Sequence, residues 1–75
     1  MPVAAKLKHR KSMGEAIRTH RKRLKISQEK LAEKADLSPT FISDLERGRV
    51  NVAVDSLLRI ANALGIQVRD IIQDF

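Results

Sequence analysis

Apolar and polar positions recur with helical spacing along most of the chain, most clearly in residues 27–48. The first half of this stretch carries a narrow apolar stripe formed by Leu31, Ala32 and Ala35. In the second half, Ile42 and Leu45 lie three positions apart and share one face of a helix. The pattern therefore predicts two short helices joined by a tight turn.

The residues around these two stripes are those that begin, turn and end helices. Ser27 and Ser38 are good N-caps, because a serine hydroxyl accepts a hydrogen bond from an unpaired N–H of the first turn. Pro39 occupies a first helical position, where its missing N–H costs nothing. Asp36 tolerates the left-handed backbone that a tight turn needs, and Gly48 ends the second helix.

An earlier helix is predicted from residue 12 to about residue 24. Ser12 and Glu15 have the spacing of a capping box. Met13, Ile17 and Leu24 are the expected inward-facing residues. Residues 1–11 show little apolar periodicity and are expected to form a flexible basic arm, with residues 12–75 as the folded domain.

Two further helices are expected after the central pair. The apolar face of the first, over residues 54–64, is formed by Val54, Leu57, Leu58, Ala61 and Leu64, and Gly65 ends it. A fifth, short helix is expected at about residues 68–74. No strand-like alternation occurs, so the predicted fold class is all-α with five helices.

The second central helix leaves short polar side chains and one Arg on its outer face. These residues are Thr40, Ser43, Asp44 and Arg47. The set suits a helix placed in a DNA major groove, which admits one helix and presents hydrogen-bonding groups to it. The alternative interpretation is an ordinary solvated helix face.

These segments resemble the Cro/repressor-type helix-turn-helix proteins over roughly residues 13–75. The matching pieces are SQEKLA at 27–32, SPTFISDLERG at 38–48 and SLLRIANALGI at 56–66. LERGR followed by Asn51 is similar to the controller proteins of restriction–modification systems. Many members have Gly in the inter-helix turn, where this chain has Asp36. The resemblance implies a five-helix Cro/repressor-like domain that binds operator DNA as a dimer.

The resemblance and the helix pattern together nominate the interface residues. Base readout is expected on Pro39, Thr40, Ser43, Asp44 and Arg47, and backbone contact on Gln28, Ser38, Arg49 and Asn51. Arg47, near the helix end, has phosphate contact as its alternative role, and Phe41 is either a core residue or a contact to DNA. The resemblance also implies a structural ion pair between Arg21 and Glu46; the alternative is two independent solvated charges.

Charge is unevenly distributed along the chain. The net charge is +6, from 15 basic and 9 acidic residues, and the basic residues are concentrated in residues 1–25. Such asymmetry favours a polyanionic partner, here double-stranded DNA. The arm has two open interpretations, a solubilising tail or a segment that lies along DNA.

Composition excludes several other functions. The chain has no Cys and 2 His, so a metal site is not expected, and neither is a disulfide. No catalytic set or Gly-rich phosphate loop occurs, so we expect no enzyme, no cofactor and no small-molecule ligand. The absence of Cys indicates a reducing compartment, so a cytoplasmic location is expected. No apolar run is long enough to span a bilayer, and the basic N-terminus lacks the apolar region of a secretory signal.

The C-terminal third is unusually apolar for a small domain. Its large apolar residues are Ile66, Val68, Ile71, Ile72 and Phe75. A soluble monomer rarely exposes a large contiguous apolar patch, so these residues predict a homodimer interface. The alternative is that all of them close the core of one chain.

The sequence thus predicts a DNA-binding transcriptional regulator that acts as a homodimer on a roughly palindromic operator. A restriction–modification controller, a phage-type repressor and an antitoxin are all compatible with it. The rival from another class is a protein-interaction module with the same fold.

Overall fold

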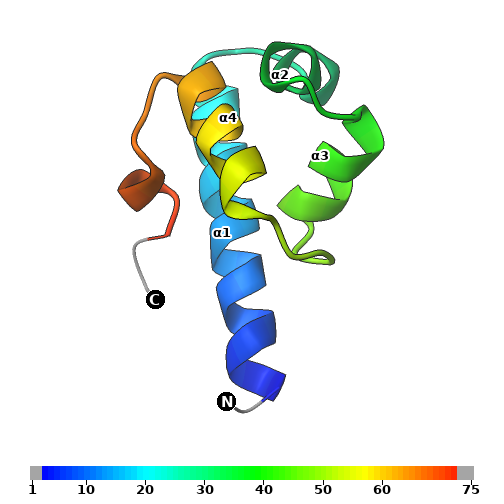
Figure 1. The fold of residues 1–75 in the computed structure, drawn as a ribbon, viewed down its shortest axis with the longest axis vertical. Coiled ribbons are helices and arrows are strands. Elements are labelled where there is room, and N and C mark those ends of the chain that lie inside the picture. Colours follow the sequence, from blue (N-terminus) through cyan, green and yellow to red (C-terminus); the bar gives the residue numbers. More distant parts are fainter. Residues whose placement is uncertain (1–2, 73–75) are drawn as a thin grey trace.

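The computed structural model describes the backbone of residues 3–72 and the side chains of residues 9–72, and all regular structure in this part is helical (Figure 1). The elements are α1 (Val3–Arg23), α2 (Gln28–Ala35), α3 (Pro39–Glu46), α4 (Val54–Leu64) and a 3₁₀ turn, η1 (Val68–Asp70). In Figure 1, α2 and α3 lie on one side of α1 and α4, and η1 lies on the other. The all-α prediction is confirmed.

The hydrophobic core lies where all four α-helices meet. α2 packs against α3 and α4, α1 packs against α3, and η1 packs against α4. The largest fully buried side chains are Ile17, Leu31, Ile42, Leu45, Ile60 and Ile71. Both stripes of the central helix pair are therefore in the core. Leu24, expected to face inward, is instead 45% exposed just after the end of α1.

The prediction of a fifth α-helix was wrong for the described residues. Gly65 ends α4 in the left-handed conformation, as expected, and only the three-residue turn η1 follows. The Asp70 carboxylate accepts a hydrogen bond from the Gln67 N–H at 2.9 Å, and this bond closes the turn on itself. Ile71, which was expected to lie at a dimer interface, then enters the core.

The first helix begins earlier than predicted. α1 starts at Val3, so Ser12 and Glu15 lie within the helix and the predicted capping box is not formed. Residues 3–11 contain no helix breaker and consist largely of good helix formers, which extend a helix already fixed by its neighbours. The side chains of Lys6 and Lys8 lie outside the described residues, and the flexibility of the arm stays a prediction.

α1 and α3 approach so closely that their backbones nearly touch at Gly14. A Cβ atom at this position would lie 2.3 Å from the Leu45 carbonyl oxygen and 2.8 Å from that of Glu46. Only glycine fits such a contact without moving one helix away from the other. Gly14 thus sets the distance between α1 and the C-terminal end of α3.

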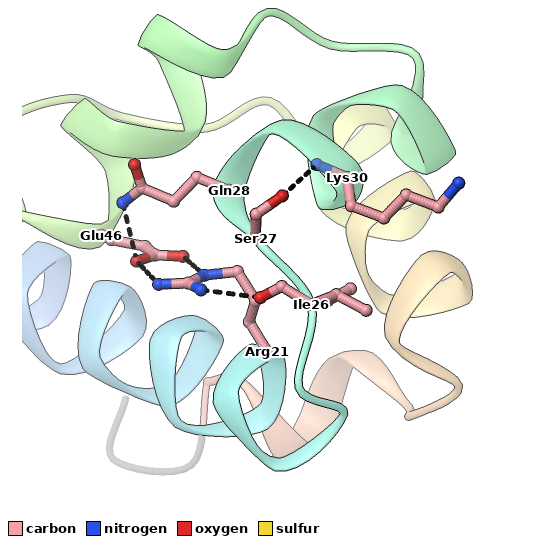
Figure 2. Close-up of polar contacts among 6 residues, drawn as sticks. All are labelled: Arg21, Ile26, Ser27, Gln28, Lys30 and Glu46. Atoms are coloured by element: carbon pink, nitrogen blue, oxygen red, sulfur yellow. Dashed lines mark hydrogen bonds and ion pairs between the residues drawn. The ribbon is translucent and has the colours of Figure 1, made fainter.

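The same two helices are joined by the Arg21–Glu46 ion pair that the resemblance implied (Figure 2). The Arg21 guanidinium donates from Nε to Glu46 Oε2 at 2.6 Å and from Nη2 to Glu46 Oε1 at 3.0 Å. Its Nη1 donates to the carbonyl of Ile26 at 2.9 Å. The side chains are only 11% and 3% exposed, so the alternative of two solvated charges was wrong. The hydrogen bonds to Glu46 raise the pKa of Arg21 further above its ordinary value.

We expect Arg21→Met to destabilise the domain by about 3–5 kcal/mol, or to unfold it, because the Glu46 carboxylate is then buried without its partner. The double variant Arg21→Met/Glu46→Leu is expected to recover part of this loss, since no unpaired charge remains. Urea unfolding followed by circular dichroism measures both.

Lys30→Met is the matched control, because it removes a Lys30–Glu33 pair whose side chains are 50% and 73% exposed. It is expected to change stability little. Equal losses for Lys30→Met and Arg21→Met would contradict a structural role of the buried pair.

Candidate nucleic-acid interface

The turn between α2 and α3 is made by Asp36. It ends α2 with φ 58° and ψ 49°, and its N–H bonds back to α2 carbonyls. Arg59 of α4 lies beside this turn, with Nη1 3.4 Å from the Asp36 carbonyl oxygen and 3.9 Å from its carboxylate. The turn thus has the left-handed geometry expected of it, with Asp in place of Gly.

Two serine caps fix the starts of the central helices. Ser27 Oγ accepts from the Lys30 N–H, and Ser38 Oγ accepts from the Phe41 N–H, each at 3.0 Å. Pro39 follows Ser38 at the start of α3. Because Ser38 uses an oxygen lone pair for this cap, its hydroxyl proton is still free to be donated to a phosphate.

The five expected readout residues do not share one degree of exposure. Pro39, Thr40 and Arg47 are exposed, whereas Ser43 and Asp44 are half-buried. Arg47 is the C-cap of α3, so it lies just beyond the helix that carries the others. Phe41 is half-buried and packs against the core, so part of its ring is still exposed on α3.

Gln28, which was predicted to contact the DNA backbone, lies at the start of α2 and is hydrogen-bonded to the buried ion pair. Its Nε2 donates to Glu46 Oε1 at 3.1 Å (Figure 2). An amide nitrogen carries two N–H donors, so one remains for a phosphate. The bond to Glu46 therefore orients the Gln28 amide without consuming its capacity to donate.

The loop after α3 contains the other two predicted backbone contacts, Arg49 and Asn51. Both are exposed, and Gly48 before them has φ +72°. Asn51 Oδ1 accepts a hydrogen bond from Arg10 Nε at 2.7 Å, across 41 positions of sequence. Sequence reasoning placed Arg10 in a detached arm and gave no signal for this contact.

The predicted dimer residues are less exposed than expected. Ile71 is 2% exposed and belongs to the core, so its assignment to an interface was wrong. Ile66, Val68 and Ile72 are half-buried against the core, and Phe75 lies outside the described residues. Two large apolar side chains of α4 are exposed instead, Val54 at 72% and Leu58 at 48%, and they lie one turn apart.

A hollow of about 340 Å³ adjoins this apolar face. It is walled by the N-terminal part of α1, the loop after α3, the first turn of α4 and Ile72. Val54 belongs both to the wall of this hollow and to the exposed face of α4. An exposed apolar face of α4 thus lies next to this hollow.

The acidic and histidine side chains of the described residues do not form a cluster. Among the described residues, no three His, Cys, Asp or Glu side chains gather closely enough to hold a metal ion. No helix there is long and apolar enough to cross a membrane. The arrangement offers exposed donors and cations for binding.

Comparison with known proteins identifies several relatives of this chain. The control protein C.BamHI of Bacillus amyloliquefaciens is 51% identical over 47 residues, covering 63% of this chain and 58% of the relative. The immunity repressor protein of Bacillus phage phi105 is 44% identical over 61 residues, covering 81% and 42%. The chain thus spans about half the length of these curated relatives.

A solved structure matches the fold. The restriction–modification controller protein C.AhdI of Aeromonas hydrophila superposes with a TM-score of 0.81 at 32% identity, covering 83% of this chain and 94% of that one. These relatives are regulators, in agreement with the expectation of no enzyme. A helix-turn-helix family model matches residues 17–71, well over half of the chain. The protein therefore belongs to the helix-turn-helix family of transcriptional regulators.

Proposed function

We propose that the protein binds double-stranded DNA sequence-specifically and regulates transcription as a homodimer on a roughly palindromic operator. The observation that carries the proposal is the exposed N-terminal tip of α3, with Pro39 and Thr40, on a helix held in place by the Gly14 contact and the buried Arg21–Glu46 pair. A helix presented by a rigid scaffold positions its side chains better than a loop does. With DNA as its target, we expect the protein to act in the cytoplasm.

The context that we propose is control of a restriction–modification system. The names of C.BamHI and C.AhdI support it, whereas the phi105 repressor supports a phage-type role. An antitoxin that also binds its own promoter is a further alternative. The alternative from another class is a protein-docking module with the same fold, and it is favoured if the protein fails to bind duplex DNA at all.

The first test is binding to a random-sequence duplex across a salt series, measured by gel shift. With about five phosphate contacts per subunit, the slope of log K against log salt for a dimer is expected near −9. No binding at low salt, or a slope shallower than about −3, would contradict the proposed footprint.

The second test separates base readout from phosphate contact on α3. We expect Thr40→Ala to lose about 1–3 kcal/mol on the operator and to relax one base position, because the N-terminal residues of a recognition helix meet base edges. The same outcome is expected of Ser43→Ala if this half-buried hydroxyl reaches a base. Arg47→Ala, at the helix end, is expected to weaken all sequences alike.

An operator selected from a random library, together with its point variants, provides the measurement. Arg69→Ala is the control, because this exposed cation lies on η1, on the opposite side of α1 from α3 (Figure 1). If Thr40→Ala weakened binding to all sequences equally, Thr40 would contact the DNA backbone rather than a base.

The third test concerns the dimer, which we propose to form through Val54, Leu58 and the edge of Ile72. A two-fold dimer with this patch on both subunits would place the recognition helices in successive major grooves, about 34 Å apart. We expect Leu58→Asp to weaken self-association at least tenfold, because it buries a charge in an apolar contact. Sedimentation measures it.

Leu24→Asp is the matched control, since Leu24 has a similar exposure, 45%, but lies at the end of α1. It is expected to leave association unchanged. A wild-type protein that stays monomeric at high micromolar concentration and binds a single half-site would rule out the dimer.

A further inference from the structure

The N-terminal part of α1 lies directly against the loop that follows α3. A Cβ atom at Gly48 would be 2.9 Å from the Cα of Lys11, so the two backbones are in close contact there. One residue earlier, Arg10 Nε donates to Asn51 Oδ1 at 2.7 Å. These contacts hold this part of α1 beside the proposed interface as a helix.

The bond to Asn51 leaves most of the Arg10 guanidinium available. It uses Nε, one of the five N–H donors of an arginine side chain. Arg10 is half-buried, and its Nη1 and Nη2 donate to no other group among the described residues. The four N–H groups on these two atoms are therefore left to donate, on an edge whose orientation Asn51 sets.

Exposed basic residues lie next to Arg10 on α1 and on both sides of Gly48 in the sequence, and Glu15 is the nearest acidic residue on α1. Lys11 is exposed beside Gly48, and Arg47 and Arg49, which flank Gly48 in sequence, are exposed as well. Glu46, the acidic residue nearest in sequence to Gly48, is buried and paired with Arg21. Such a surface attracts an anion, and a guanidinium with two free terminal nitrogens matches the paired oxygens of a phosphate.

We infer that Arg10 contacts a DNA phosphate and that Asn51 acts by positioning the Arg10 guanidinium, not by contacting DNA itself. The inference rests on the proposed function and extends its footprint to α1. It also changes the role of Asn51, which the sequence had assigned to direct backbone contact. A guanidinium already held in place loses less side-chain entropy on binding than one on a mobile arm.

The experiment is a salt series of binding to a random-sequence duplex by fluorescence anisotropy, with the full chain. Arg10→Gln removes the charge but keeps a side-chain N–H for Asn51. We expect it to make the slope shallower by about 0.9 for each phosphate that Arg10 no longer neutralises, about two units for a dimer. Arg10→Ala is expected to do the same, and Arg69→Ala to leave the slope unchanged.

Asn51→Ala distinguishes positioning from direct contact. It keeps every charge, so we expect weaker binding with the wild-type slope. In the Arg10→Ala background, Asn51→Ala is expected to cause no further loss. Thermal unfolding of each variant confirms that the proteins compared are folded.

Three outcomes would decide against the inference in different ways. If wild type binds duplex and both Arg10 variants keep its slope, Arg10 is outside the interface, although the proposed function stands. If the losses from Arg10→Ala and Asn51→Ala are additive, Asn51 contacts DNA independently. If wild type binds no duplex at low salt, the proposed function itself fails.

Discussion

The arrangement of α3 depends on one buried interaction, the bond between the Arg21 guanidinium and the Glu46 carboxylate. Arg21 comes from α1, Glu46 is the last residue of α3, and the same guanidinium also holds the Ile26 carbonyl between α1 and α2. Gln28 adds the start of α2 to this network through Glu46. Because a buried charge without its partner is costly, partial separation of these elements is unfavourable, and α3 keeps one orientation. We expect this buried pair to contribute more to the defined position of α3 than to net stability.

Two glycines complement the Arg21–Glu46 pair. The pair fixes the orientation of α3, and the glycines fix the distance between α1 and the C-terminal end of α3. Gly14 allows the α1 backbone to approach the carbonyls of Leu45 and Glu46, and Gly48 allows the following loop to approach Lys11. Both contacts lie at the C-terminal end of α3, the end that also carries Glu46. The N-terminal end is fixed differently, by the Ser38 cap and the Asp36 turn. The helix that we propose to read DNA is therefore restrained at both ends by local features of the sequence.

The sequence predicted the central helices well because their signals are local. Ser27, Ser38, Pro39 and Gly65 act through their own backbone neighbours, and each lies where it was expected. The Arg21–Glu46 pair spans 25 positions, and only family resemblance indicated it. The start of α1 was missed because its extension follows from propensity and tertiary contact, without an apolar stripe.

The burial of the C-terminal residues could not be deduced from their apolarity alone. Whether an isoleucine closes the core or faces a partner depends on the space left by the other helices, and that space is a property of the whole packing. Ile71 is taken into the core, while Val54 and Leu58, on the helix expected to be fully packed, are left outside. Some features of the proposed DNA interface could be predicted from the sequence and others could not. The tip of α3 is exposed as expected. The hydrogen bond between Arg10 and Asn51 could not be predicted, because only the fold brings these two residues together.

The position of charge on this fold suggests how affinity and specificity are separated. Phosphate contacts position a protein on DNA and carry no sequence information, whereas base contacts specify. In this protein the exposed tip of α3 is neutral, with Pro39 and Thr40, and the cations Arg47, Arg49 and Lys11 gather at its other end. If the protein binds DNA as we propose, a change in the polar residues of the tip is expected to alter the sequence read, while the cationic end that we propose to bind phosphates keeps the domain in place. That division requires the two ends of α3 to be held rigidly relative to each other, which the buried pair and the two glycine contacts provide.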